Sequence, residues 1–356
     1  MRTTRFIILG FLIGVAATVG VYAWKITWHC VNGEQTTHAS PIKAVSTPPA
    51  AIAHTPIDRK SPLTPESPPS LLPDKDWPQD APTPEQVIYD QSRLLDKEIA
   101  QLKPRTPGKV NLYALVFAGD GGENVFRNEA EYFEKLFSQR FGATGHVLVL
   151  ENNPAALTTR PLADWSNLEV ALDALASKMD MQNDIMLLYF TSHGSEDHFL
   201  YVDMDPLPLD QIGASDMASI LKKQPFHWKV IVVNACYSGG FIPPLRGAGT
   251  LVITAARADR SSFGCGAQSQ ITYFSHAFLD DALNRTNDPV QAFSIARKEV
   301  ATWEKSDGYI SSQPQIDIGA GIAAKLAQWE KQSPPGAAVP FLPASDESKR
   351  ASVTAH

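Results

Sequence analysis

Residues 184–195 are Asp-Ile-Met-Leu-Leu-Tyr-Phe-Thr-Ser-His-Gly-Ser, and residues 229–240 are Lys-Val-Ile-Val-Val-Asn-Ala-Cys-Tyr-Ser-Gly-Gly. Each segment holds a short, nearly continuous apolar run, which is typical of a strand buried on both faces of a parallel sheet. In open α/β sheets, ligands bind beyond the carboxyl ends of the strands. The sequence therefore places His193 and Cys236 where such a sheet carries its chemistry.

The surrounding chain alternates between strand and helix patterns. We expect strands at residues 112–118, 146–150, 185–191, 229–235, 250–254 and 315–318, with a short hairpin around 199–203. We expect helices at residues 129–141, 167–180, 214–223, 273–284 and 289–305. Strands that alternate with helices indicate βαβ units and a mostly parallel sheet with right-handed crossovers. This globular domain is predicted to span residues 109–331.

The N-terminal region, residues 1–29, is predicted to be a transmembrane signal-anchor. Residues 6–24 are apolar and uncharged, and 19 residues of helix span about 28 Å, close to the thickness of a bilayer core. Arg2 and Arg5 precede the run, so the N-terminus is expected in the cytoplasm and the rest of the chain outside it. The alternative is a cleaved signal peptide, because Val21-Tyr22-Ala23 resembles a cleavage site.

Three further segments flank the domain. Residues 30–82 are proline-rich and are predicted to form a disordered linker that holds the domain away from the membrane. Residues 83–108 are predicted to form a helix and connector, with Thr83 as N-cap and Pro84 at the first helical position. Residues 332–356 are predicted to be a disordered tail.

The composition excludes some classes of partner. The net charge is −7, with 31 basic and 38 acidic side chains, and this balance argues against nucleic acid as the main partner. The three cysteines include no CxxC pair, so a cysteine-based zinc site is not expected. No metal or other cofactor is predicted, and the oligomeric state is left open.

His193 and Cys236 together predict nucleophilic catalysis. A neighbouring histidine raises the thiolate fraction of a cysteine, and acyl transfer also requires N–H donors for the developing oxyanion. In this hypothesis the Cys236 sulfur attacks a peptide carbonyl and His193 moves the proton. The backbone N–H groups of Gly194 and Cys236 hold the oxyanion. The alternatives are a packed, inert thiol and an ordinary strand-end histidine.

The motifs Phe-Thr-Ser-His193-Gly-Ser and Asn-Ala-Cys236-Tyr-Ser-Gly-Gly resemble the His-Gly and Ala-Cys-x-Ser-Gly blocks of legumain-like cysteine peptidases. Those peptidases belong to the caspase-like group, and the chain resembles a bacterial, membrane-anchored member. Three more blocks, in residues 125–132, 253–265 and 272–273, agree in order. The resemblance implies a caspase-like three-layer α/β/α sandwich with a central, mainly parallel six-stranded sheet. It also implies peptide or protein substrates, and endopeptidase or transpeptidase chemistry without a metal.

The resemblance also implies roles for further residues. Arg127 corresponds to an arginine of the specificity pocket, and Ser261 and Ser262 to the strand that binds substrate. Asn234 stands where legumains have an acidic residue, and His276 falls where a second pocket acid is expected. These residues are therefore candidate substrate-binding positions. A third catalytic residue that orients His193 is expected in the loop after the first strand; Asn124 is the candidate, and Asp120 is the alternative.

Several other interpretations compete with these. Cys265 is either a packed thiol near the cleft or a redox partner. The acidic residues of the 196–205 segment form either a calcium site or, more simply, a solvated surface. Gly119-Asp-Gly-Gly122 does not match the dinucleotide-binding GxGxxG spacing. The leading hypothesis is a cysteine endopeptidase tethered to the inner membrane with its catalytic domain in the periplasm. The alternative is a catalytically inactive binding or scaffold domain of the same fold.

Overall fold

A computed structural model describes residues 77–266 and 268–343. The predicted anchor at 6–24 and the predicted linker as far as residue 76 lie outside these described residues. Within the described ranges, none of the helices combines the length and apolar character needed to cross a bilayer.

A six-stranded sheet forms the centre of the fold, with the strand order β2-β1-β3-β6-β7-β8. The strands are β1 (Leu112–Ala118), β2 (Val147–Glu151), β3 (Ile185–Thr191), β6 (Trp228–Asn234), β7 (Thr250–Thr254) and β8 (Gln315–Ile318). The first five are parallel, and β8 pairs antiparallel with β7. A separate two-stranded sheet pairs β4 (Phe199–Leu200) with β5 (Ile212–Gly213). The mainly parallel sheet is confirmed, and the predicted hairpin is a shorter pairing with a more distant segment.

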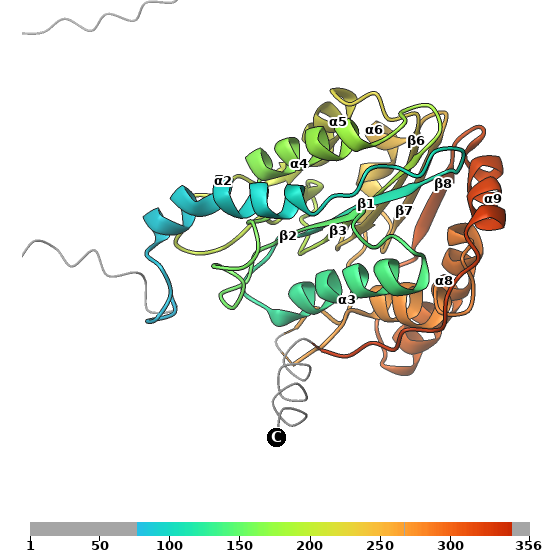
Figure 1. The fold of residues 1–356 in the computed structure, drawn as a ribbon. Coiled ribbons are helices and arrows are strands. Elements are labelled where there is room, and N and C mark those ends of the chain that lie inside the picture. The colour runs from blue at the N-terminus through green and yellow to red at the C-terminus, as the bar shows by residue number, and fades with distance from the viewer. Residues whose placement is uncertain (1–76, 267, 344–356) are drawn as a thin grey trace, which may run out of the picture. The chain divides into compact units, whose positions relative to one another are not determined.

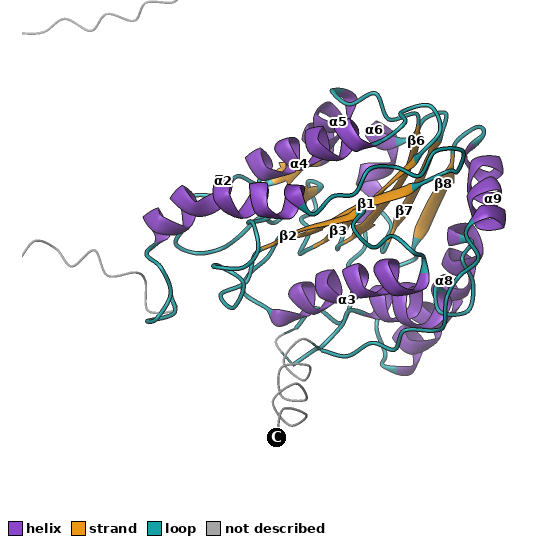
Figure 2. Cartoon of the chain, viewed as in Figure 1, coloured by secondary structure: helices purple, strands orange, loops and turns teal. Residues whose placement is uncertain are grey.

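Helices cover both faces of the sheet and complete a three-layer α/β/α fold (Figures 1 and 2). One face carries α3 (Asn124–Arg140), α7 (Tyr273–Ser275), the π-helix η2 (His276–Ala282), α8 (Pro289–Ser306) and α9 (Ile322–Gln332). The other face carries α2 (Pro84–Ala100), α4 (Trp165–Lys178), α5 (Ala214–Lys222) and α6 (Ile242–Leu245), which follows the 3₁₀-turn η1 (Ser238–Phe241).

Alternation along the central strands explains why both faces are apolar. In β1, Leu112, Ala114 and Val116 belong to the core under α3, whereas Tyr113, Leu115 and Phe117 belong to the core under α4. Successive side chains of a strand point to opposite faces, so a continuous apolar run supplies two cores at once.

Three helices differ from those predicted from the sequence. Helix α3 begins at Asn124 rather than at residue 129, because Val125 and Phe126 are already buried against the sheet. The helix predicted over 273–284 is instead the short α7 followed by the π-helix η2. Helix α9 was not predicted, although its Ile322, Leu326 and Trp329 are buried.

The helix at 84–100 is part of the domain. Its capping box at Thr83 and Gln86 is present, and Val87, Leu94 and Leu95 are buried. The buried Gln91 carboxamide accepts hydrogen bonds from Leu162 N and Asn167 Nδ2.

The segment after α9 also packs on the domain. Val339 is buried; its carbonyl accepts a hydrogen bond of 2.8 Å from the Tyr132 hydroxyl, and Arg140 donates to the Gly336 carbonyl. The prediction of a disordered tail from residue 332 is therefore wrong for residues 333–343, because these contacts give the chain a partner that its proline-rich composition did not reveal.

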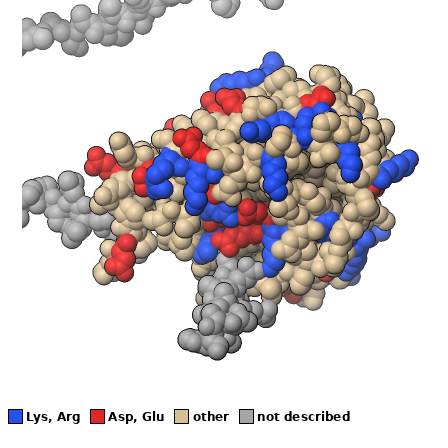
Figure 3. All heavy atoms as spheres, in the orientation of Figure 1, with Lys and Arg blue, Asp and Glu red and all other residues tan. Residues whose placement is uncertain are grey.

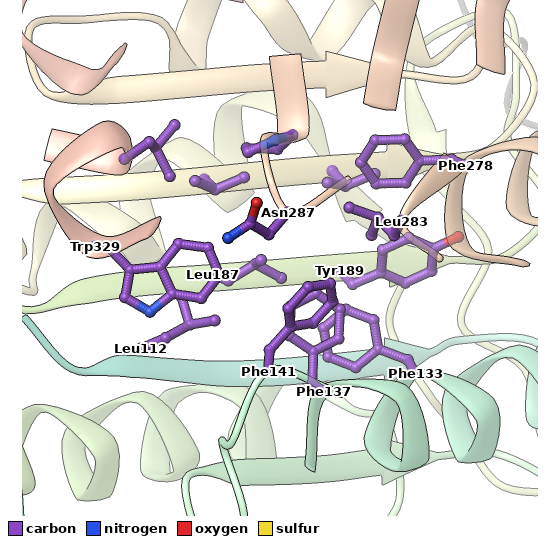
Figure 4. Close-up of a pocket in the computed structure, with 14 residues that line it drawn as sticks. Leu112, Phe133, Phe137, Phe141, Leu187, Tyr189, Phe278, Leu283, Asn287 and Trp329 are labelled. Atoms are coloured by element: carbon purple, nitrogen blue, oxygen red, sulfur yellow. The ribbon is translucent and has the colours of Figure 1, made fainter. Parts of the chain in front are cut away.

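The core under α3 contains a small apolar cavity of about 20 Å³ (Figure 4). It is lined by Phe133 and Phe137 of α3, Phe141 directly after α3, Leu187 and Tyr189 of β3, and Trp329 of α9. This space is about large enough for one water molecule. Neither His193 nor Cys236 lines it, so it is a packing void of the core.

Acidic and basic side chains are interspersed over the face of the molecule shown in Figure 3. This face carries no broad field of positive charge of the kind that phosphate binding requires.

Candidate active site

The sheet register brings the two predicted catalytic residues to neighbouring strand ends. Thr191, the last residue of β3, is paired with Asn234, the last residue of β6. His193 and Cys236 each lie two residues beyond these partners, and Ser192 N donates to Asn234 O at 3.2 Å. Parallel strands end at the same edge of a sheet, so the pairing predicted from the two apolar runs is present in the structure.

Gly194 and Tyr237 show how closely the two loops approach. A Cβ atom on Gly194 would lie 2.2 Å from the carbonyl oxygen of Cys236, so only glycine fits there without a shift. Tyr237, directly after the nucleophile, has φ of 56° and bends the chain away from the strand direction. Its N–H donates to Arg260 O at 2.7 Å, which fixes the turn.

The two proposed oxyanion donors are available. Within the part of the chain that the structure describes, neither the Gly194 N–H nor the Cys236 N–H donates a hydrogen bond. An unpaired backbone N–H beside a nucleophile can bind a developing negative charge.

The Cys236 sulfur lies in an environment that favours the thiolate. Ser262 N donates to Sγ at 3.2 Å, and the Ser262 hydroxyl lies 3.6 Å from Sγ. The pKa of Cys236 is lowered to about 5, first by a hydrogen bond from the Cys265 thiol and then by Ser262 and His193, against the opposing effect of burial. The pKa of Cys265 is raised by the same contact and by burial, so this thiol keeps its proton. The hydrogen bond from Ser262 N and the nearby His193 make Cys236 the candidate nucleophile.

His193 is held by a carboxylate. Its Nε2 lies 2.8 Å from Glu123 Oε2, and the ring of Phe126 packs against the imidazole at 5.1 Å with an interplanar angle of 82°. Because Nε2 faces Glu123, Nδ1 is the ring nitrogen that can exchange a proton with the Cys236 thiol. A carboxylate bonded to one imidazole nitrogen fixes the ring orientation and stabilises the imidazolium.

The assignment of Asn124 as the residue that orients His193 is therefore wrong in this structure. The Asn124 side chain accepts a hydrogen bond from Asn153 Nδ2 at 3.1 Å, whereas the adjacent Glu123 contacts His193. Glu123 is the N-cap residue of α3 in extended conformation, and Asn124 is the first residue of the helix. The two side chains leave the backbone in different directions because the chain changes conformation between them.

Asp120, the alternative candidate, lies close to the same histidine. It is buried, its Oδ1 accepts a bond from Gly122 N at 2.8 Å, and burial raises its pKa. Ligand atoms of Asp120, Glu123 and His193 lie within 4.8 Å of one another, close enough to hold a metal ion. The direct Glu123–His193 hydrogen bond satisfies both groups without one.

Arg127 faces carboxylates of the domain itself. Its Nε lies 2.8 Å from Glu131 Oε1 and 3.9 Å from Glu151 Oε1, at the end of β2. Glu151 is buried, neither of its oxygens has a hydrogen-bond partner among the residues that the structure describes, and burial raises its pKa to about 8. A substrate-binding role for Arg127 stays a prediction.

Asn234 lies inside the protein. It is 1% exposed, and its Nδ2 lies within 3.2 Å of four acceptor atoms, on Glu129, Thr191, Thr272 and Ser275. The prediction that Asn234 contacts substrate is wrong in this structure, because the side chain is completely covered. It forms part of a buried polar network beneath the two catalytic loops.

The remaining predicted substrate-binding residues are Ser261, Ser262 and His276, and they differ in their contacts. Ser262 contacts Cys236 directly, and Ser261 is its partly exposed neighbour. His276 stacks on Trp303 at 4.9 Å and lies 3.7 Å from Asp280. The contacts of His276 are thus with α8 and η2.

A row of aromatic rings extends from the Ser262 side of the nucleophile. Phe263 stacks on Tyr309 with ring centroids 4.2 Å apart and planes 9° from parallel. Tyr309 contacts Tyr273, which contacts Trp303, and Trp303 contacts His276. Tyr309 and the next residue, Ile310, are 48% and 71% exposed.

Glu123 and Glu129 were missed by the sequence analysis. Glu123 stands within the same loop as the two candidates that were considered, but nothing in the local pattern distinguishes it from them. Glu129 lies on a helix whose sequence is rich in charged residues, so its burial was not apparent. A signal was present in the spacing, because Glu129 shares a helix face with Val125, Phe126 and Phe133, all buried.

Three comparisons show which known proteins the chain is similar to. Residues 170–324 match the model of the peptidase C13 family. Among solved structures, one similar fold is pro-sf-caspase-1, with a TM-score of 0.43 and 13% sequence identity over 59% of this chain and 88% of that chain. A search of curated proteins found no match.

Proposed function

We propose that this chain, whose residues 170–324 match the peptidase C13 family, is a legumain-like cysteine peptidase in which Cys236 and His193 catalyse endopeptidase cleavage through an acyl-enzyme. The family implies a peptide or protein substrate. The observation that carries the proposal is the placement of a low-pKa thiol and a carboxylate-bonded histidine at adjacent strand ends.

The proposed reaction proceeds in two stages. The Cys236 thiolate attacks the scissile carbonyl carbon, and the N–H groups of Gly194 and Cys236 stabilise the oxyanion. His193, as the imidazolium, gives a proton to the leaving amine, and the thioester remains. His193 then takes a proton from water as the water attacks the thioester carbon, and the C–S bond breaks to release the acid product. The Cys236 thiolate and the His193 imidazolium are thereby restored. Glu123 holds the imidazole through both stages.

The substrate's acyl half is proposed to lie along residues 261–263. His193 protonates the amine, so the amine half leaves past the histidine. Ser262 contacts the sulfur, and the Phe263–Tyr309 stack and Ile310 follow. The partly exposed Phe263 and the exposed Tyr309 and Ile310 fit an apolar side chain on the amino side of the scissile bond.

The proposed location is the cell envelope, with residues 6–24 as a single-pass anchor and the catalytic domain in the periplasm. The support is the uncharged apolar run after Arg2 and Arg5, followed by a proline-rich segment. Reporter fusions after residue 82 test this: a periplasmic alkaline phosphatase fusion is active under the proposal and inactive if the domain stays in the cytoplasm.

Labelling of the full chain in detergent with a peptidyl electrophile tests the enzymatic function. The expected result is one label on Cys236, lost in Cys236→Ala and strongly reduced in His193→Ala, together with Cys236-dependent cleavage of a peptide library. A folded protein that shows neither labelling nor cleavage is instead the catalytically inactive binding domain.

A further inference from the structure

A single buried carboxylate connects the strand ends that precede both catalytic residues. Glu129, in the second turn of α3, has no solvent exposure. Its Oε2 accepts hydrogen bonds from the Thr191 hydroxyl and from Asn234 Nδ2, the latter at 3.0 Å. Thr191 lies two residues before His193, and Asn234 lies two residues before Cys236.

The second oxygen of the Glu129 carboxylate binds a third segment of the chain. Glu129 Oε1 accepts a hydrogen bond of 2.8 Å from Thr272 N, at the start of α7. The Thr272 hydroxyl accepts from Asn234 Nδ2 at 2.9 Å, and the Ser275 hydroxyl lies 2.6 Å from the Tyr189 hydroxyl. The network therefore joins α3, β3, β6 and α7 at one point beneath the loops that carry His193 and Cys236.

The hydrogen bonds to the buried Glu129 carboxylate are costly to break, so they hold the groups around it in place. A buried carboxylate without partners is strongly destabilised, and removal of one partner leaves the other groups unsatisfied. Burial raises the pKa of Glu129, and the hydrogen bonds from Thr191 and Thr272 oppose that shift. Thr191, Asn234 and Thr272 all donate to this carboxylate, so a displacement of β3 relative to β6 at their last residues strains the bonds that hold Thr191 and Asn234 to it.

We propose that Glu129 is a positioning residue that sets the distance and orientation between His193 and Cys236 by fixing Thr191 and Asn234 to the same carboxylate oxygen. The proposal rests on the proposed peptidase function for its biological meaning, since it concerns how the Cys/His pair is kept in reactive geometry. Glu129 itself touches neither the substrate nor the reacting atoms. Small errors in such geometry are costly in rate.

The alkylation rate of Cys236 by iodoacetamide tests this without a known substrate. The full chain in detergent is treated between pH 4 and pH 9, and modification of the peptide containing Cys236 is quantified by mass spectrometry. Glu129→Gln places an amide against at least one donor, and we expect alkylation at pH 7 to slow by about tenfold. The pH midpoint of the rate is expected to move upward, because His193 and Ser262 no longer face the sulfur correctly.

A second substitution provides the rescue. Adding Asn234→Asp to Glu129→Gln supplies an acceptor opposite the new amide and is expected to recover most of the rate. If Glu129→Gln does not fold, Thr191→Val, which removes one donor at nearly constant shape, is measured in the same way and is expected to slow alkylation.

Asp184→Asn is the matched control. Asp184 is also a buried carboxylate with several donors, among them Asn111 N at 2.9 Å, but it lies immediately before the amino end of β3, away from His193. It is expected to lower the melting temperature and leave alkylation of folded Cys236 unchanged. The proposal is overturned if Cys236 in Glu129→Gln is alkylated at the wild-type rate, or if Asp184→Asn slows alkylation as much as Glu129→Gln does. Absence of peptide cleavage by the wild type would refute the proposed function without affecting this result.

Discussion

The carboxylate of Glu123 lies 2.8 Å from Nε2 of His193, and the residue that provides it is the N-cap of α3. The proposed catalytic residue His193, which follows β3, is thus connected to a helix on one face of the sheet. This arrangement makes the His193–Glu123 pair sensitive to how α3 packs.

Replacement of Glu123 tests its role directly. Glu123→Gln retains a group of the same size but loses the negative charge that stabilises the imidazolium. We expect kcat to fall by about tenfold to a hundredfold with little change in KM. Steady-state kinetics on a cleaved peptide measure this. Asn124→Ala is measured in parallel, and a larger loss in that variant than in Glu123→Gln would contradict the assignment.

The close approach of Gly194 to Cys236 gives a steric prediction. In Gly194→Ala the new Cβ lies 2.2 Å from the Cys236 carbonyl oxygen, so one of the two loops must move. We expect a loss of about 1–3 kcal/mol in stability, and loss of Cys236 labelling, because the same loops hold the oxyanion donors. Thermal unfolding and probe labelling measure the two effects.

Gly247→Ala is the control for that change. A Cβ on Gly247 meets nothing within 4 Å, and the residue is not among those with positive φ. The melting temperature of Gly247→Ala and the labelling of its Cys236 are expected to match those of the wild type. Equal losses in both variants would show that the contact with Cys236 is not the cause.

The pH dependence of Cys236 reactivity follows from its lowered pKa of about 5. Alkylation is expected to be near its plateau at pH 7 and to fall by half near pH 5. Because the hydrogen bond from Cys265 is the largest cause of the shift, Cys265→Ala is expected to move this midpoint upward, and Cys265→Ser less so. An unchanged midpoint in Cys265→Ala would contradict the thiol–thiol contact.

The lowered pKa of Cys236 also makes the free energy of unfolding depend on pH. A thiol whose pKa is lower in the folded state than its ordinary value of 9 favours folding at pH above the ordinary value. That contribution is lost as the pH falls from 9 toward 5. Wild-type unfolding is therefore expected to show a rise in stability over this range that is absent in Cys236→Ala.

The contacts of residues 333–343 predict the effect of truncation. Removal of residues 332–356 exposes the surface covered by Val339 and breaks its bond to the Tyr132 hydroxyl, at a cost of about 1.5–3 kcal/mol for the buried valine alone. The melting temperature is expected to drop by several degrees. Removal of 344–356 alone is the control and is expected to have little effect. Equal melting temperatures for the two truncations would contradict the observed packing.

The exposed Tyr309 and Ile310 predict a preference for apolar side chains in the acyl half of the substrate. Tyr309→Ala with Ile310→Ser is expected to reduce cleavage of library peptides with an apolar residue there by about tenfold or more. Cleavage of peptides with polar residues is expected to change little. Tyr89→Ala removes an equally large tyrosine that is 85% exposed on α2 and serves as the control. An unaltered cleavage profile in the double variant would contradict the placement of the acyl half.

The sequence by itself determined the sheet and the ends of the strands that carry chemistry. The apolar runs at 185–190 and 230–233 are buried on both sides, so their length and composition fix them as central strands. His193, Gly194 and Cys236 follow these runs directly, so each lies just beyond the carboxyl end of its own strand. Local sequence was sufficient here because hydrophobic periodicity is a local property.

Only the tertiary structure decided which polar groups meet at the site. Glu123 and Asn124 are neighbours in the chain, but the start of α3 sends one side chain to His193 and the other to Asn153. Asn234 and Glu129 stand 105 residues apart, and their burial together depends on α3 packing beneath β3 and β6. A hydrogen bond depends on the direction of a side chain to within a fraction of an ångström, and distant segments set that direction through packing.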